Sequence, residues 1–539
     1  MRKENSLLMQ KYFSKYSLVL LIILMASCAK RGTITGGDKD TIAPVLESSL
    51  PKNFTKNFVS KEIQLYFDEY VKVKNANKQL IISPPMKNMP DILPYNASKV
   101  ITIRIKDTLL PNTTYSMNFG QSIEDNNEGN HLKQFKYVFS TGTYIDSLMQ
   151  KATIKDALEK KTDDYVSIMM YEVNDKFNDS TIYKETPRYI TNTLDSIKIA
   201  QLENLRAGFY KLIAIKDVNG NNKFDAKSDK IGFIDDAVNV PNDNTYQIAM
   251  FKEQVPFKAI TVSQASPKKL YLGYEGKNNN VKVVVQRGEE VLPHILTKLP
   301  KKDTLQVWIK PLKKDSLNVM VSKDNFSKSF PVKISEQKKD SLKFSSDQAS
   351  ALDFREKFTI NSTVPLIKFD SSKMRLINKD STAVKFTTDY DEFNQNLKFN
   401  FTPEPLEKYS LRLLPGALTD FYERVNDTLK YDFTTNNTSD YGNMKVILEN
   451  VKRFPVIVQL TDSEGKVLAS EYTEKETEIN FDLLQPTKYT LRVIYDDNKN
   501  KEWDTGSYIE KRQPEEVIYF PKEIDLHANW DWVETFRLE

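Results

Sequence analysis

Short apolar runs alternate with polar clusters along most of the chain, roughly one run in every ten residues, the spacing expected of consecutive β-strands. Runs such as 281–285 and 305–309 are rich in Val, Ile, Leu and aromatic residues, and clusters of Asp, Asn, Ser, Lys and Pro separate them. In 489–494 the order Tyr-Thr-Leu-Arg-Val-Ile places one face of a strand in a core. The pattern therefore predicts an all-β protein built from sandwiches.

Two internal duplications divide the chain. In the first, residues 111–117 and 137–141 correspond to residues 405–411 and 431–435 with a constant offset of 294. In the second, residues 205–225 align without a gap with residues 484–504, at an offset of 279. A constant offset means that corresponding loops have equal lengths, which indicates repeated structural units.

These segments also carry family resemblances. Residues 63–71, Ile-Gln-Leu-Tyr-Phe-Asp-Glu-Tyr-Val, together with the strand at Tyr115 and the closing Phe-Ser-Thr at 139–141, resemble the bacterial Ig-like domain of surface-layer and lipoprotein families. The second copy, which ends near Asn436, keeps the Tyr strand and ends in a similar Phe-Thr-Thr motif. It has no match to the Phe-Asp-Glu-x-Val motif near the start of the first copy. The Leu-x-x-Gly-x-Tyr-x-Leu pattern and the polar loop after it, within 205–221, resemble the prealbumin-like, carboxypeptidase-regulatory-like β-sandwich.

The repeats and resemblances give the domain plan. We predict an all-β tandem array of β-sandwich domains, Ig-like and prealbumin-like, that follows a lipoprotein signal peptide. The expected parts are a signal peptide (1–27), a flexible tether (28–40), an Ig-like domain (41–142), a prealbumin-like sandwich (143–254), an unassigned β domain (255–345), a second Ig-like domain (346–437) and a second prealbumin-like sandwich (438–539).

The pattern at the N-terminus predicts export and a lipid anchor. A basic start precedes an apolar run, 17–25, that is too short to cross about 30 Å of hydrocarbon. Leu24-Met25-Ala26-Ser27-Cys28 resembles the bacterial lipobox, although Met25 departs from the usual order. The resemblance implies that Cys28 is lipidated and becomes the mature N-terminus; the alternative is a cysteine without a special role after an ordinary signal peptide. Cys28 is the only cysteine, so disulfides within the mature chain are excluded.

Composition excludes several functions. Lys and Arg total 77 against 73 Asp and Glu, and the charges are interspersed, so no nucleic-acid partner is expected. The chain has no His-Glu-x-x-His, Gly-x-Ser-x-Gly or phosphate-loop motif, and its three histidines fall in different expected domains. We therefore predict that it is not an enzyme. Paired carboxylates such as Asp68 and Glu69, or Asp235 and Asp236, are interpreted as solvated loop charges.

Two polar loops are candidates for a cation. Oxygen-bearing side chains recur at alternate positions, the spacing that converges ligands on a hard cation such as calcium, with an expected affinity of about 10⁻⁴ to 10⁻³ M and a structural role. Position twelve is Ser228 or Ser507 rather than Glu, so Asp229 or Asp497 would supply the missing carboxylate. The alternative is a strand-end loop in which Asp and Asn bond their own backbone. The candidate ligands are Asp217, Asn219, Asn221, Asp225, Asp496, Asn498, Asn500 and Asp504.

Asp followed by Ser or Thr recurs along the chain and resembles the O-glycosylation sequon of exported Bacteroidota proteins. The alternative is that these pairs begin turns, as is common in β proteins. The candidate acceptors are Thr41, Thr108, Ser147, Ser180, Ser196, Thr304, Ser316, Ser341, Ser381 and Thr428.

These features together predict a non-enzymatic, lipid-anchored interaction or scaffold protein of the outer membrane. One concrete version is an accessory lipoprotein of an outer-membrane protein assembly, the β-barrel assembly machinery, or of a transport complex, with an outer-membrane protein as partner. The alternatives are a cell-surface glycan-binding lipoprotein that uses Trp503, Trp530 and Trp532, and an unrecognised hydrolase. The cell surface is favoured, but Ala29-Lys30-Arg31-Gly32 lacks an acidic export cluster, so the periplasmic face is the alternative location.

Overall fold

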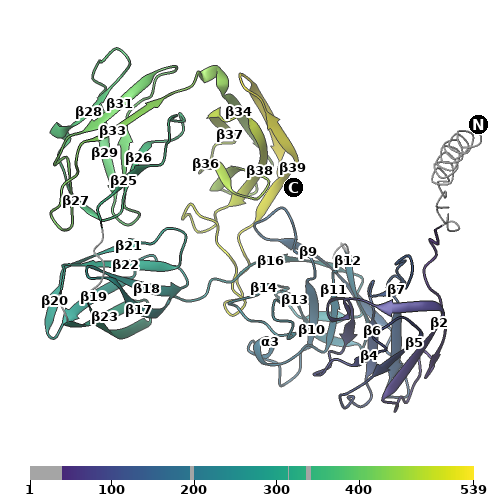
Figure 1. Ribbon diagram of the computed structural model, residues 1–539. Helices are drawn as coiled ribbons and strands as arrows, with labels where there is room; N and C mark the ends of the chain where they lie inside the picture. Colours follow the sequence, from purple (N-terminus) through teal and green to yellow (C-terminus); the bar gives the residue numbers. More distant parts are fainter. Residues whose placement is uncertain (1–38, 195–198, 313–314, 336–340) are drawn as a thin grey trace, which may run out of the picture.

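The computed structural model describes residues 39–194, 199–312, 315–335 and 341–539, and β-strands dominate them (Figure 1). The helical elements of this described part are single turns: α2 (Ala76–Gln79), α3 (Thr181–Lys184), η1 (Ser371–Lys373) and η2 (Thr438–Asp440). The all-β prediction is thus confirmed. In the described ranges, no helix has the length and apolar character needed to cross a bilayer.

Five hydrophobic cores follow one another along the chain, and we number the corresponding β units 1 to 5. The buried residues of these cores fall within 58–139, 152–250, 257–334, 352–433 and 444–538. Each core lies between small sheets whose strands alternate buried and exposed side chains, as in Ile63, Leu65 and Phe67 of unit 1. The molecule is therefore a set of β-sandwiches rather than a single large core.

Unit 1 packs the sheet β1-β2-β5-β4, to which β7 is added, against the sheet β3-β6-β8. Its long strand β2 changes partner along its length: the first part pairs with β5, and the last residues, from Val71, pair with β7. The strands are β1 (Leu46–Leu50), β2 (Glu62–Val73), β3 (Ile81–Ser83), β4 (Asp91–Leu93), β5 (Ser98–Arg104), β6 (Thr114–Asn118), β7 (Ile123–Asp125) and β8 (Lys136–Ser140).

Unit 2 packs the sheet β11-β10-β13-β14, joined by β15, against the sheet β12-β9-β16, in which β9 and β16 run parallel. The strands are β9 (Leu148–Asp156), β10 (Ser167–Glu172), β11 (Tyr189–Asn192), β12 (Ile199–Leu205), β13 (Gly208–Lys216), β14 (Lys230–Phe233), β15 (Val238–Val240) and β16 (Thr245–Met250).

Unit 3, which has no family resemblance in its sequence, packs the sheet β17-β18-β22-β21 against the sheet β20-β19-β23-β24. The strands are β17 (Lys258–Ser266), β18 (Lys269–Glu275), β19 (Lys282–Arg287), β20 (Glu290–Leu292), β21 (His294–Lys298), β22 (Thr304–Ile309), β23 (Asp315–Lys323) and β24 (Phe326–Ile334).

Unit 4 contains the sheets β25-β26-β30-β29, β28-β31-β33 and β27-β32. The strands are β25 (Phe344–Ser346), β26 (Phe358–Ser362), β27 (Leu366–Phe369), β28 (Met374–Ile377), β29 (Thr387–Asp391), β30 (Asn396–Asn400), β31 (Lys408–Leu413), β32 (Leu418–Asp420) and β33 (Leu429–Thr434).

Unit 5 packs the sheet β36-β35-β38-β39 against the sheet β37-β34-β40, in which β34 and β40 run parallel, as β9 and β16 do in unit 2. The strands are β34 (Gly442–Glu449), β35 (Val456–Thr461), β36 (Val467–Thr473), β37 (Glu478–Leu484), β38 (Thr487–Tyr495), β39 (Val517–Leu526) and β40 (Asp531–Arg537).

The first duplication is visible in the hydrogen bonds of units 1 and 4. Tyr115 pairs with Phe139 across β6 and β8, and Tyr409 pairs with Phe433 across β31 and β33. The two ring pairs have centroid separations of 5.3 and 5.5 Å. Both tyrosine hydroxyls also accept a backbone N–H from five residues upstream, at 2.9 and 2.8 Å. The repeat that the sequence indicates is therefore a repeat in space.

The chain does not extend as a simple row of units. In Figure 1 the C-terminal segment, drawn in yellow, returns to unit 2 beside β9, β14 and β16. Arg492 of β38 and Tyr519 of β39 both donate to the carbonyl oxygen of Leu158 in unit 2, at 3.1 and 2.6 Å. Units 2 to 5 thus form a closed series.

Candidate functional site

The two candidate cation loops, 217–225 and 496–504, begin with an aspartate that bonds its own backbone. The Asp217 carboxylate accepts the N–H groups of Gly220 and Asn222, each at 2.7 Å. The Asp496 carboxylate, fully buried, accepts the N–H groups of Asn500 and Lys501 at 3.1 and 2.8 Å. The bonds from Asn222 and Lys501 lie at corresponding positions, and both loops fold as compact turns.

A second carboxylate closes each loop. Asp229, which is 0% exposed, accepts the N–H of Val218 at 3.1 Å and that of Asp225 at 2.8 Å. Asp229 is one of the two carboxylates that the sequence proposes for this position. Its bonds join the two ends of the loop, so this side chain fixes the shape of the loop.

Glu515 does in the second loop what Asp229 does in the first. It accepts the N–H of Asp497 at 2.8 Å and that of Asp504 at 2.9 Å. The Asp497 side chain, which the sequence offers for this role, pairs instead with Arg453 at 2.6 Å. Alignment at constant offset misses Glu515 because a longer segment separates it from Asp504. Its signal is a carboxylate just before the next strand, β39, and recognising it requires allowing that insertion.

Burial governs the ionisation of Glu515. Loss of solvent raises its pKa, the N–H donors of Asp504 and Asp497 oppose that rise, and the neighbouring Asp496 and Asp504 carboxylates add to it. A raised pKa means that ionised Glu515 costs folding free energy at neutral pH. The carboxylate is held there because two backbone donors would otherwise lack an acceptor.

The candidate ligands converge better in the second loop. Asn498 and Asn500 both donate side-chain N–H groups to Asp504 Oδ2, at 2.5 and 2.6 Å. In the first loop, by contrast, Asn219 donates to Ser228 and Asn221 accepts from the Lys223 N–H. In the described part of the chain, no three His, Cys, Asp or Glu side chains are grouped as metal ligands. Hydrogen bonds account for both loop shapes, and calcium binding stays a prediction.

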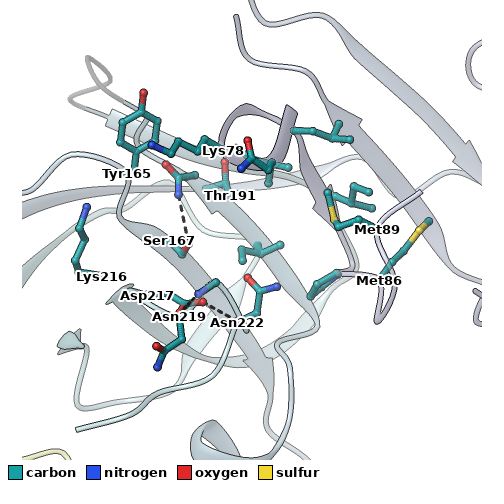
Figure 2. A pocket seen from close by; sticks show the side chains of 18 of the residues that line it. Lys78, Met86, Met89, Tyr165, Ser167, Thr191, Lys216, Asp217, Asn219 and Asn222 are labelled. Carbon is teal, nitrogen blue, oxygen red and sulfur yellow. Dashed lines mark hydrogen bonds between the residues drawn. The ribbon is translucent and has the colours of Figure 1, made fainter. Parts of the chain in front are cut away.

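The first loop lines a cavity of about 640 Å³ between units 1 and 2, shown in Figure 2. Met86 and Met89 of unit 1 form an apolar wall, and Asp217, Asn219 and Asn222 lie on the opposite side. The remaining labelled lining residues are Lys78, Tyr165, Ser167, Thr191 and Lys216. One wall therefore offers flexible thioether side chains and the other amide, hydroxyl and carboxylate groups.

Two charged side chains that line this cavity are engaged by backbone groups. Its one lining carboxylate, Asp217, has both oxygens engaged by backbone N–H groups, and Lys216 Nζ donates to the Asp164 carbonyl oxygen. No described residue lining it is a histidine or a cysteine.

The structure brings together two of the three candidate tryptophans. The rings of Trp530 and Trp532 stack with an interplanar angle of 8° and a centroid separation of 6.0 Å, and Trp530 is 46% exposed. Trp503 lies elsewhere: it packs beside the apolar cluster of unit 2, and its indole N–H donates to the Glu515 carbonyl. A glycan surface would therefore involve the stacked pair without Trp503.

Most candidate sequon residues in the described ranges lie at the surface. Ser180 and Thr304 are half-buried. Cys28, the signal peptide, nearly all of the tether and Ser196 lie outside the described residues. Glycosylation stays a prediction, checked by comparing the intact mass of native protein with that of the polypeptide. The exposed candidates are Thr41, Thr108, Ser147, Ser316, Ser341, Ser381 and Thr428.

Comparison with known proteins supports the Ig-like assignment of unit 1. The family model of a bacterial Ig-like domain, Big_5, matches residues 40–141. A search of curated protein sequences returns no match.

Among solved structures, domains 1 to 6 of the surface layer protein SbsC align with 90% of this chain and 68% of that one, at 10% identity and a TM-score of 0.16. A tandem of titin Ig domains aligns with 34% of this chain and 98% of that one, at 9% identity and a TM-score of 0.14. Scores this low carry no conclusion about function.

Proposed function

We propose that this protein is a non-enzymatic, lipid-anchored scaffold of the outer membrane that holds a protein partner. The observation that carries the proposal is the succession of β-sandwich units joined by specific contacts, with a cleft between units 1 and 2. Such a framework holds exposed loops in fixed positions, and loops on rigid sandwiches are common binding surfaces.

The contacts between units 1 and 2 support a fixed cleft. Lys136 of unit 1 pairs with Glu203 of unit 2 at 2.6 Å, and Arg206 of unit 2 donates to the Asn112 carbonyl at 2.8 Å. The Ile190 N–H donates to Ser83 Oγ at 3.1 Å, which ties β11 to β3 beside the cavity. Because the two walls are bonded to each other, the cleft does not need to form on binding.

The finer version of the proposal is an accessory lipoprotein of an outer-membrane protein assembly or transport complex. It rests on the lipobox resemblance at Cys28, which would hold the chain at the membrane, and on the cleft between units 1 and 2, which offers a partner one apolar and one polar wall. We expect the cell surface as the location, and protease treatment of intact cells distinguishes it from the periplasmic face.

Affinity purification of the full chain from detergent-solubilised membranes tests this function. We expect one outer-membrane protein to co-purify in stoichiometric amount. Met89→Asp places a charge on the apolar wall of the cleft and should reduce recovery of that partner at least about tenfold, the loss expected for burying an unpaired charge at an interface. Met149→Asp is the control, because Met149 is exposed to the same degree (46% against 47%) and is not among the lining residues of the cleft.

Glycan binding is the second candidate, favoured by the stacked and partly exposed tryptophan pair. Trp530→Ala would remove the exposed ring, while Trp503→Ala would leave the pair intact. The scaffold proposal would give way to glycan binding on two results. The chain would bind polysaccharide, with only Trp530→Ala abolishing that binding, and no stoichiometric protein partner would co-purify.

A further inference from the structure

The segment 505–514 has no counterpart in the first copy of its loop. In unit 2 the closing carboxylate, Asp229, follows Asp225 directly after one turn, whereas in unit 5 this segment lies between Asp504 and Glu515. The extra residues leave unit 5 and pack on the outer face of the β11-β10-β13-β14 sheet of unit 2. We call residues 505–514 the latch.

Tyr508 is the centre of the latch. It is 1% exposed and belongs to a cluster with Phe224, Phe233 and Phe251 of unit 2. Its ring meets that of Phe233 edge-on, with centroids 5.2 Å apart. The contact covers an apolar face that unit 2 does not cover with its own second sheet.

Polar bonds surround this aromatic contact. The Tyr508 N–H donates to the Glu253 carboxylate, and Thr505 Oγ1 donates to the Lys252 carbonyl at 2.6 Å. Gln513 Nε2 donates to the Phe233 carbonyl at 3.1 Å. These bonds place the latch in one register on unit 2.

Gly506 shows how closely the two units approach. A Cβ at this position would lie 2.6 Å from Phe251 Cζ and 2.8 Å from the Arg512 carbonyl oxygen. Both distances are shorter than van der Waals contact, so a side chain here would force either the Phe251 ring of unit 2 or the backbone of the latch to shift.

The closed latch buries one polar group that has no hydrogen-bond partner among the described residues. The Tyr508 hydroxyl is buried and has no hydrogen-bond partner among the described residues. Burying a hydroxyl without a partner disfavours the closed state relative to an open one in which water bonds it. The tyrosine that fills the aromatic cluster therefore also weakens the closure.

We propose that residues 505–514 form a reversible latch between units 5 and 2, with Tyr508 as its releasable element. In the closed state the latch and the Leu158 carbonyl contacts join the ends of the series formed by units 2 to 5. When the latch opens, the Tyr508 hydroxyl regains water and the aromatic face of unit 2 becomes accessible. The latch thus controls both the shape of the series and the exposure of an apolar surface.

Hydrogen exchange of the full chain, followed by mass spectrometry of the peptide that covers 505–514, tests the proposal. Tyr508→Phe keeps the ring and removes the unpartnered hydroxyl, so exchange of this peptide should slow by about tenfold, equal to about 1.4 kcal/mol. Tyr508→Ala should make the same peptide exchange as an open loop. Ile509→Ala is the control, because Ile509 is 56% exposed in the same segment.

Trypsin cleavage after Lys511 and Arg512 gives a second readout and should follow the same order of variants. Unchanged exchange in strands β34 and β35 shows that unit 5 remains folded in each variant. If Tyr508→Phe exchanges as fast as the wild type or faster, the hydroxyl does not weaken the closure and the proposal fails. It also fails if Tyr508→Ala leaves exchange and cleavage unchanged, since the segment is then not held by this side chain.

Discussion

At the scale of single residues, buried carboxylates that accept several backbone N–H groups organise the loops of this protein. Asp125 at the end of β7, Asp229 after the first polar loop and Glu515 after the second all act in this way. In each case backbone N–H groups replace water as the hydrogen-bond donors to the carboxylate. Removing the side chain therefore leaves buried donors without acceptors. The sequence shows these carboxylates only as members of polar clusters.

Asp125 should make unit 1 sensitive to acid. Although burial would raise its pKa, the N–H groups of residues 127–130 lower the pKa to about 2, against an ordinary value of 3.8. A lowered pKa stabilises the fold above the ordinary value, and this contribution is lost as pH falls from about 4 to about 2. Urea unfolding of unit 1, followed by hydrogen exchange of its peptides, should show that loss.

Asp125→Asn is the matching variant. The free energy of unfolding of unit 1 should fall by about 2 kcal/mol at pH 7, since one acceptor oxygen becomes a donor that faces the Asn130 N–H. The variant should also lose most of the dependence of stability on pH between about 2 and about 4. Equal acid sensitivity in variant and wild type would assign the effect to other groups.

The closing carboxylates predict a matched pair of effects. Glu515→Ala removes the acceptor for two N–H groups and should increase hydrogen exchange in 496–504, with a loss of about 2 kcal/mol in loop stability. Asp229→Ala should do the same in 217–225. Asp497→Ala, which removes a surface ion pair, should cost less than about 1 kcal/mol. A larger effect at Asp497 than at Glu515 would reverse this assignment.

Calcium binding at the second loop remains our proposal because Asn498, Asn500 and Asp504 converge there. Millimolar calcium should raise the melting temperature of the full chain, since a ligand bound only to the folded state stabilises it. Asp504→Asn should abolish the rise and Asp225→Asn should not. The absence of both binding heat and a melting shift in the wild type contradicts the proposal.

At the scale of elements, strand β13 differs from the usual strand of an antiparallel sheet, which buries one face and leaves the other to solvent. Tyr210, Leu212 and Ala214 face the core of unit 2, while Ile213 and Ile215 enter the cluster that contains Tyr508. Both faces are thus buried. Apolar residues on the second face were visible in the sequence, but their partner comes from a segment almost three hundred residues later in the chain.

The duplicated tyrosines allow a test of element equivalence. Tyr115→Phe removes the acceptor for the Leu110 N–H, and Tyr409→Phe removes that for the Glu404 N–H. Each change should lower the stability of its own unit by about 1 kcal/mol, because one hydrogen bond is lost at a buried ring. Urea unfolding, followed by hydrogen exchange of peptides from units 1 and 4, measures both stability changes. A large effect on one unit alone would argue against the equivalence of the two tyrosines.

At the scale of the whole molecule, the junctions between units decide the shape. Trp308 of unit 3 is fully buried with Val364 and Phe421 of unit 4, and its indole N–H donates to Thr297 Oγ1 at 2.9 Å. At the next junction, Arg355 of unit 4 donates to the Asp482 carbonyl of unit 5 at 2.8 Å. Together with the latch, these contacts turn a row of domains into a closed series.

Trp308→Ala should loosen the junction between units 3 and 4. The lost packing is expected to cost about 3 to 5 kcal/mol, typical of removing a buried tryptophan. Small-angle scattering of the full chain should then show a larger radius of gyration. Trp530→Ala, at an exposed position outside the junctions, should leave the radius unchanged; an equal increase in both variants would mean that unfolding rather than loosening is measured.

The sequence by itself determined the all-β class, the two duplications and the positions of the polar loops. These features depend on neighbouring residues, whose alternation, spacing and turn chemistry are readable locally. The tertiary structure decided that Glu515 closes the second loop, that both faces of β13 are buried and that unit 5 returns to unit 2. Each depends on residues far apart in the chain, whose meeting follows from side-chain packing that no local pattern records.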